Sequence, residues 1–91
     1  MNAYNRSRRA GIASAIATLK LERGCADCGY DARPEALQFD HLPGNEKAGG
    51  VAEMIWKAAS LEAVLDETEK CEVVCANCHS VRTSERRLLE V

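Results

Sequence analysis

The sequence predicts a small α+β domain, and three observations lead to that class. Cysteines occur as two CxxC pairs, Cys25 with Cys28 and Cys75 with Cys78. Several stretches show helical periodicity, and two short segments have the alternating or valine-rich character of strands. The 91 residues form one domain, 1–91, whose core by itself gives only marginal stability.

Residues 1–23 predict a basic N-terminal helix. Ile12, Ile16 and Leu19 occupy the i, i+4 and i+7 positions of one helix face. Gly24 predicts the end of this helix, immediately before the first cysteine pair.

Two strands are expected, one on each side of a helical insertion. Residues 36–42 alternate in polarity and carry Asp40 and His41 near their end, and residues 72–75 form a short β-prone segment. A final helix over residues 76–89 follows directly. Its inward contacts are expected from Val81, Leu88 and Leu89.

The insertion between the strands begins with a turn at residues 43–45 and contains two helices. The Gly-Gly pair at residues 49–50 opens the first helix, whose apolar stripe runs over residues 51–58. Ser60 is expected to cap the N-terminus of the second helix.

The two CxxC pairs predict a structural Zn²⁺ site. A tight turn presents both sulfurs of a pair to one tetrahedral ion, so Cys25, Cys28, Cys75 and Cys78 form a complete ligand set. A redox dithiol is the alternative, although a second matched pair argues against it. Because four thiolates leave no open coordination position, this zinc is expected not to be the catalyst. The fifth cysteine, Cys71, is interpreted as a buried small apolar residue.

Charge is distributed unevenly along a chain whose net charge is −2. Residues 1–23 carry about +4, residues 24–78 carry −7 and residues 79–91 carry +1. Basic ends on an acidic middle suit a protein that contacts a polyanion through selected elements, although solvated helix faces give the same pattern. The basic side chains considered for such contact are Arg6, Arg8, Arg9, Lys20, Arg82 and Arg86.

The composition favours a cytoplasmic protein with no membrane segment. No apolar run is long enough to cross a bilayer, and the polar, basic N-terminus lacks the apolar region of a signal peptide. Thiols in CxxC pairs fit a reducing cytosol better than an oxidised secreted scaffold.

The two histidines and one aspartate remain as candidates for chemistry. A strand histidine is more often a core residue with a satisfied hydrogen bond, and that interpretation applies to His41 taken alone. Asp40 precedes it and projects to the opposite face of a strand unless the chain bends. His79 follows Cys78 directly, so one shared zinc would bring the His79 helix close to the Asp40 strand.

Together these motifs resemble the HNH family of endonucleases. The resemblance is carried by residues 39–43 (FDHLP) and residues 72–83 (EVVCANCHSVRT), together with the upstream cysteine pair. It covers about residues 20–84, and small phage-encoded members are most similar in length and layout. It implies a zinc-stapled ββα-metal, treble-clef-like core over residues 24–91, with the N-terminal helix outside it and two helices inserted between its strands.

The resemblance implies a role for each of three residues. His41 matches the general base that deprotonates a water, and Asp40 and His79 match ligands of one catalytic divalent ion. Two positions depart from the family pattern. Lys70 stands near the position of an Asn that holds the hairpin in shape, and Pro43 follows His41 one residue sooner than in the family's D-H-x-x-P. Both departures concern the orientation of the base.

The function implied is metal-dependent hydrolysis of DNA phosphodiester bonds, as nicks or as double-strand breaks. Imidazole titrates near neutral pH and suits a general base, while a divalent ion stabilises charge developing on the phosphate. One carboxylate and one imidazole favour Mg²⁺ or Mn²⁺, with Ni²⁺ or Co²⁺ as further candidates. For a phage-encoded member, the host cytoplasm is the expected location and the genome-packaging terminase a family-based partner.

Two other classes of protein fit parts of the pattern. A zinc-containing DNA-binding module with impaired catalysis is favoured by Lys70 at the usual Asn position. A zinc-scaffolded protein-interaction domain would leave Asp40, His41 and His79 without a joint role. Sequence preference on DNA and oligomeric state are not predicted by these residues.

Overall fold

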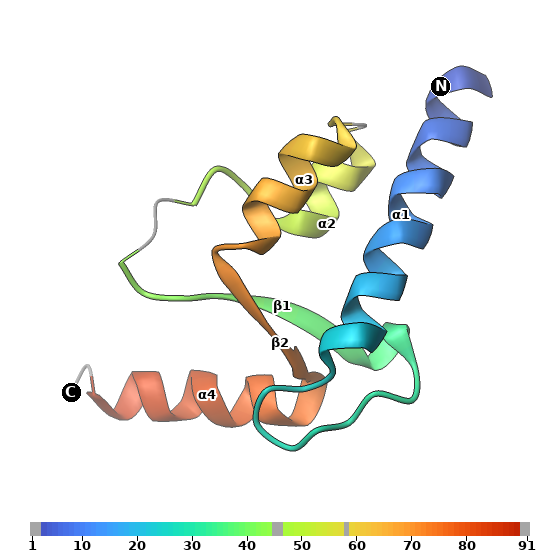
Figure 1. Cartoon of the computed structure of the whole chain (residues 1–91). Helices are drawn as coiled ribbons and strands as arrows, with labels where there is room; N and C mark the ends of the chain where they lie inside the picture. Colours follow the sequence, from blue (N-terminus) through green and yellow to red (C-terminus); the bar gives the residue numbers. More distant parts are fainter. Residues whose placement is uncertain (1–2, 45–46, 58, 90–91) are drawn as a thin grey trace.

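The computed structural model describes residues 3–44, 47–57 and 59–89. Within these ranges the chain forms a small α+β fold with four α-helices and a two-stranded antiparallel sheet (Figure 1). In chain order the elements are α1 (Ala3–Arg23), the 3₁₀ turn η1 (Pro34–Ala36), β1 (Leu37–His41), α2 (Val51–Trp56), α3 (Leu61–Thr68), β2 (Cys71–Cys75) and α4 (Ala76–Leu89). None of the helices in the described part of the chain is long and apolar enough to span a bilayer.

The two strands pair antiparallel, and helices α2 and α3 lie between them in sequence, as predicted. Leu37 pairs with Cys75 at one end of the ladder, and His41 pairs with Cys71 at the other. Helix α4 runs along one side of the sheet, whereas α2 and α3 lie on the other side, where α1 also contacts β1 (Figure 1). Because side chains alternate along a strand, neighbouring residues of β1 face different helices.

The core consists of two clusters of buried side chains, and Phe39 packs against both. One cluster joins α1, α2 and α3 to the start of β2 and contains Ile12, Ile16, Val51, Val64 and Cys71. The other lies between the first cysteine pair and the sheet and contains Cys25, Leu37, Val73 and Val74. Ile12 and Ile16 are nearly fully buried, and Leu19 packs against the same cluster, which confirms the apolar stripe predicted for α1.

Two predicted helix boundaries are confirmed by their hydrogen bonds. Gly24 follows α1 with a φ of 65°, and its N–H donates to the carbonyl of Lys20 at 2.8 Å. At the start of α3, Ser60 Oγ accepts a hydrogen bond from the N–H of Ala63 at 3.1 Å. Three residues of the predicted insertion, Asn45, Glu46 and Ala58, lie outside the described residues.

The predicted inward contacts of α4 are wrong. Three apolar residues are more than half exposed: Val81 at 55 %, Leu88 at 73 % and Leu89 at 85 %. The helix presents a polar face to the sheet instead, because His79, Arg82 and Arg86 occupy the i, i+3 and i+7 positions of one face. All three side chains approach Asp40 of β1, so ionic contacts hold this face of α4 to the sheet, and Cys78 at the start of the helix packs against the core.

Candidate functional site

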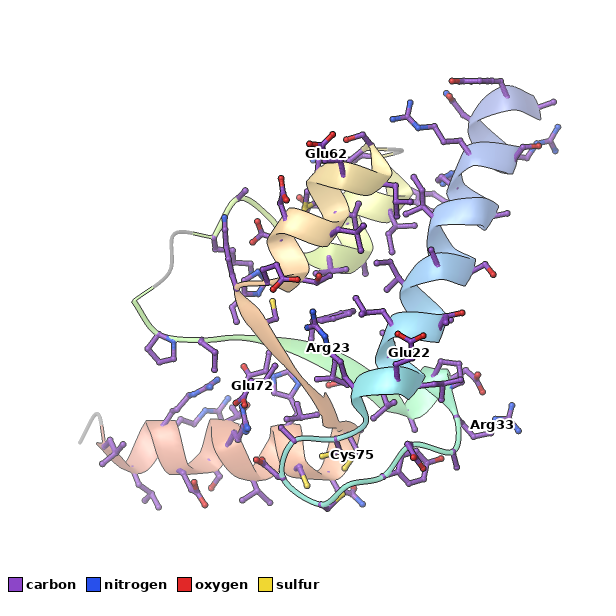
Figure 2. The ribbon with its side chains drawn as sticks, in the orientation of Figure 1. Glu22, Arg23, Arg33, Glu62, Glu72 and Cys75 are labelled. Atoms are coloured by element: carbon purple, nitrogen blue, oxygen red, sulfur yellow. The ribbon has the colours of Figure 1, made fainter. Side chains whose placement is uncertain are left out.

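The four paired cysteines form one cluster that can hold a zinc ion. Their Sγ atoms all lie within 4.8 Å of one another. The Sγ atoms of Cys28 and Cys75 are 3.8 Å apart, about the spacing of two sulfurs on a tetrahedral zinc with bonds of about 2.3 Å. Figure 2 shows Cys75 where β2 runs into α4, with further sulfur atoms beside it. The predicted ligand set is therefore brought together.

The backbone around Cys25 favours the thiolate form of this one cysteine, whereas hydrogen bonds among the neighbouring thiols raise the pKa of Cys28 and Cys78. Gly29 has a φ of 82° and donates its N–H to the carbonyl of Cys25 at 2.8 Å, which closes the first turn tightly. Burial raises the pKa of the Cys25 thiol, but hydrogen bonds from the backbone of Cys75 and Cys28 outweigh that effect and lower the pKa to about 6. A thiolate is the form that binds zinc, so Cys25 is prepared for that role.

Cys71 lies outside this cluster, as predicted. Its side chain is buried, and its thiol donates to the carbonyl of Glu67 at 3.5 Å. Burial, followed by the negative charge of Glu67, raises the pKa of Cys71 to about 11. The thiol therefore stays protonated at neutral pH and behaves as a small core residue.

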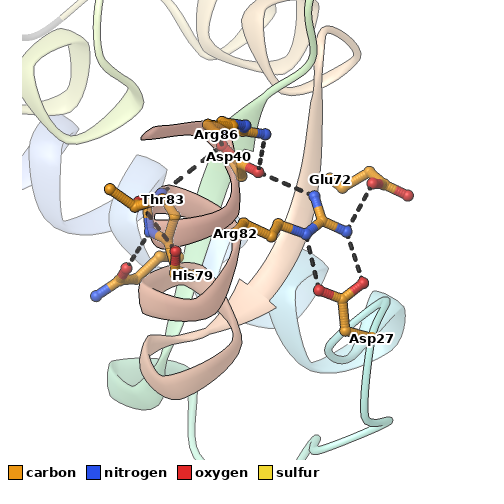
Figure 3. A network of polar contacts seen from close by, with 8 residues as sticks. Asp27, Asp40, Glu72, His79, Arg82, Thr83 and Arg86 are labelled. Atoms are coloured by element: carbon orange, nitrogen blue, oxygen red, sulfur yellow. Dashed lines mark hydrogen bonds and ion pairs between the residues drawn. The ribbon is translucent and has the colours of Figure 1, made fainter. Parts of the chain in front are cut away.

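A second site forms where Asp40 of β1 meets His79 of α4. The Asp40 side chain is 3 % exposed, and its Oδ1 lies 3.7 Å from His79 Nε2 (Figure 3). The other ring nitrogen of His79, Nδ1, is 2.5 Å from Oε1 of Gln38, which stands two residues earlier on the same side of β1. The structure thus brings Asp40 and His79 together, as the tether between Cys78 and His79 led us to expect.

The nitrogen of His79 that faces Asp40 is Nε2, and the hydrogen bond from Nδ1 to Gln38 determines that Nε2 is an acceptor when the ring is neutral. Because Gln38 Oε1 accepts, His79 Nδ1 carries the hydrogen, and Nε2 of a neutral ring presents a lone pair to the carboxylate. Two acceptors that face each other repel unless a cation lies between them. Either a proton on Nε2 or a metal ion satisfies this pair, and imidazole with carboxylate is a common metal-binding combination.

Two arginines of α4 also bind Asp40. Arg86 donates to Oδ1 at 2.8 Å and to Oδ2 at 2.7 Å, and Arg82 donates to Oδ2 at 2.9 Å (Figure 3). Arg82 also donates twice to Asp27, between the cysteines of the first pair, and once to Glu72. Hydrogen bonds from Arg86, and then from Arg82, hold the pKa of Asp40 below its usual value despite burial. Asp40 is therefore ionised, and neither arginine is a freely solvated cation.

His41 lies on the other side of the sheet, away from the carboxylate of Asp40. Its Nε2 is 2.7 Å from Oε2 of Glu67, a buried residue of α3. Strand alternation explains this separation, because β1 stays straight enough for neighbouring side chains to face different helices. The structure therefore does not place the three sequence-predicted site residues on one face.

Glu67 is a site residue that the sequence interpretation missed. Besides His41 it binds Lys70 Nζ at 3.0 Å and the N–H of Ala48 at 3.3 Å. Burial raises the pKa of Glu67, but hydrogen bonds from Lys70 and then His41 outweigh burial and lower it. Lys70, near the position of the family's Asn, thus acts on His41 indirectly through Glu67. One signal was available, since Glu67 stands three residues after Val64 on the buried face of α3.

The basic residues of α1 that were considered for DNA contact lie in two places. Arg9 stacks on the exposed ring of Trp56, 4.2 Å from its centroid, and together with Arg6 it lines a surface hollow of about 330 Å³. Arg8 is half-buried. Lys20 lies further along the helix, with its Nζ 5.6 Å from the ring centroid of Phe39.

No protein-family model, curated protein or solved structure matches this chain in the comparisons. The resemblance to HNH endonucleases therefore rests on the motif residues alone.

Proposed function

We propose that this protein is a metal-dependent endonuclease that hydrolyses DNA phosphodiester bonds, with a ββα-metal site of the HNH type. The observation that carries this proposal is the approach of His79 Nε2 to Asp40 Oδ1 at 3.7 Å, on the strand and helix that flank the four-cysteine cluster. In this proposal the cluster holds a structural Zn²⁺ and fixes the start of α4, and with it His79.

Asp40 and His79 would hold the catalytic divalent ion. One carboxylate and one imidazole leave most of the coordination positions to water and phosphate, which suits Mg²⁺ or Mn²⁺ and also accommodates Ni²⁺ or Co²⁺. The ion supplies Lewis-acid stabilisation for the phosphate and the departing oxygen. Arg82 and Arg86 compete for the same carboxylate, so modest metal affinity is expected.

His41 would act as the general base through Nδ1. Its Nε2 is held by an ionised carboxylate, so Nε2 carries the hydrogen and Nδ1 keeps the lone pair. His41 and His79 lie on different sides of β1, but Gln38 lines both the hollow beside His41 and the hollow beside His79. A DNA backbone lying across Gln38 at the edge of β1 would therefore reach both sides.

A plasmid-cleavage assay with added Mg²⁺ or Mn²⁺ tests this function. The wild-type protein should convert supercoiled DNA to nicked or linear forms, and Asp40→Asn and His79→Ala should each abolish conversion while zinc stays bound. Ser80→Ala is the matched control, since Ser80 is the exposed neighbour of His79 and should cleave normally. No cleavage by the wild-type protein with any divalent ion tried would contradict the proposal, as would full activity of both site variants.

A zinc-containing DNA-binding module without catalysis is the second candidate. It is favoured by one observation: Arg82 and Arg86 together donate three hydrogen bonds to the Asp40 carboxylate, with which any metal ion must compete. This candidate predicts salt-dependent DNA binding without cleavage, and the cleavage assay combined with a mobility-shift series separates the two.

A further inference from the structure

We infer that the hollow beside His41 binds one phosphate of the DNA backbone together with its deoxyribose. This hollow, the Lys20–His41 hollow, measures about 330 Å³ and lies between α1, β1 and α2. Its cationic or titratable lining residues are Lys20, Lys47 and His41. The inference deepens the proposed function and rests on it for the identity of the ligand, but the chemistry of the hollow is independent of cleavage.

The charge of this hollow is opposite to the net charge of the segment that supplies most of its lining. Residues 24–78 carry a charge of −7, yet no aspartate or glutamate is among the lining residues that the structure describes. Lys20 and Lys47 form no ion pair with any described carboxylate, whereas Lys57 and Lys70 each pair with a glutamate. The two ammonium groups of this hollow are therefore left to an external anion, whereas the His41 ring beside them is held by Glu67.

Lys20 is a partly desolvated cation with no described carboxylate as its ion-pair partner. Its side chain is half-buried, and burial lowers its pKa. The ring of Phe39, 5.6 Å from Nζ, compensates for part of the lost hydration. An ammonium that is partly buried without a carboxylate partner gains from any anion that completes its surroundings.

The rest of the lining matches a sugar and not only a phosphate. Ile16, Val51 and Ile55 give the hollow an apolar wall, against which the carbon face of a deoxyribose packs. Gln38 stands at the boundary with a second hollow of about 460 Å³, which contains His79, Thr83 and Arg87. A strand that places one phosphate between Lys20 and Lys47 can thus continue over Gln38 toward His79.

Duplex-DNA binding across a salt series tests this inference without requiring catalysis. Lys20→Gln and Lys47→Gln should each weaken binding. Each should reduce the magnitude of the slope of log K against log salt concentration by about one, and the double variant should reduce it by about two. Lys20→Arg should retain binding because it keeps the charge. Lys57→Gln is the matched control and should bind as wild type, since that lysine pairs with Glu53 outside the hollow.

Three outcomes decide the matter. Wild-type affinity and slope in the double variant would overturn the inference, whereas the proposed function would fail separately, through absence of cleavage by the wild-type protein. NMR signals of the His41 ring should shift on addition of the duplex. Shifts caused by inorganic phosphate but not by the duplex, at equal ionic strength, would assign the hollow to a small free anion and would also overturn it.

Discussion

His41 of β1 and Glu67 of α3 are joined by a hydrogen bond of 2.7 Å, which ties the end of a strand to the inserted helices. Glu67 is 2 % exposed, and its carboxylate is held by Lys70 and Ala48 as well. A carboxylate fixed in this way sets both the orientation and the tautomer of the imidazole. The inserted helices therefore orient the residue that we propose as the base.

Glu67→Gln should lower the free energy of unfolding at neutral pH, and this destabilisation should disappear in acid. A carboxylate whose folded pKa lies below the ordinary value of 4.5 stabilises the fold above that pH, and the stabilisation disappears as the pH falls through the folded pKa. The gap in melting temperature between wild type and variant should therefore narrow below about pH 4.5. Glu62→Gln, an exposed change on the same helix, should show no gap at any pH. A gap for Glu67→Gln that stays constant with pH would contradict this prediction.

Zinc should be required for the fold. About one Zn²⁺ per chain is expected, and a strong chelator should unfold the domain because metal-binding free energy is part of the folding free energy. Cys75→Ser should lose zinc and lower the melting temperature sharply. Cys71→Ser serves as the control, since Cys71 lies outside the cluster and its variant should keep zinc. Elemental analysis measures the zinc content, and thermal melts measure the melting temperature. A folded, zinc-free wild-type protein would exclude a structural zinc.

Divalent-ion binding should strengthen when Arg86 is removed. Arg86 donates two hydrogen bonds to Asp40, and a metal ion must compete with them. Arg86→Gln should tighten Mn²⁺ binding on the order of tenfold, which corresponds to about 1.4 kcal/mol. Arg87→Gln removes the same charge from the neighbouring exposed position and should change affinity much less. Calorimetry with Asp40→Asn should show no binding event, and an unchanged isotherm would place the metal elsewhere.

His41→Ala should separate the base from the metal ligands. The variant should keep zinc, Mn²⁺ binding and DNA binding but lose cleavage by roughly 10²-fold, the usual scale for loss of a general base. His79→Ala should lose both cleavage and Mn²⁺ binding. The two variants are compared by their cleavage rates at saturating metal and by their Mn²⁺-binding isotherms. Wild-type cleavage by His41→Ala would remove this residue from the mechanism.

The arginines at the start of α1 should contribute to DNA affinity and not to chemistry. Replacement of Arg6, Arg8 and Arg9 with Ala should weaken DNA binding. It should also reduce the magnitude of the slope of log K against log salt concentration by up to about three, since up to about three phosphate contacts are lost. Turnover at saturating DNA should change little, because the residues that would perform the chemistry are untouched. Arg33→Ala is the control, an exposed arginine paired with Glu35. Equal affinity of the triple variant across a salt series would show that these side chains do not contribute to DNA binding.

Features set by short-range signals were predictable from the sequence. The cysteine pairs, the Gly24 helix end and the Ser60 cap each depend on residues a few positions apart, where spacing and backbone geometry decide the outcome. The two strands were predicted for the same reason, since alternation in the first and the β-prone valines of the second are visible within a few residues.

The ionic partners could not be predicted in this way. Glu67 lies 26 positions from His41, and Arg86 lies 46 positions from Asp40, so each pairing depends on how the helices dock and not on local pattern. The same cause explains the error at Leu88. The face of α4 that packs on the sheet is the one whose charged residues bind the buried carboxylate of Asp40, which leaves Leu88 exposed. Hydrophobic periodicity does not register such a preference.

Trp56 is the only tryptophan of the chain, and it is 71 % exposed beneath the guanidinium of Arg9. Indole emission depends on the polarity and charge around the ring, so a nucleic acid that displaces Arg9 alters the intrinsic fluorescence without any added dye. The lining residues of the hollow beside Trp56 include neither His41 nor His79. Stopped-flow emission therefore times the arrival of a ligand at α1 separately from any later event at the histidines.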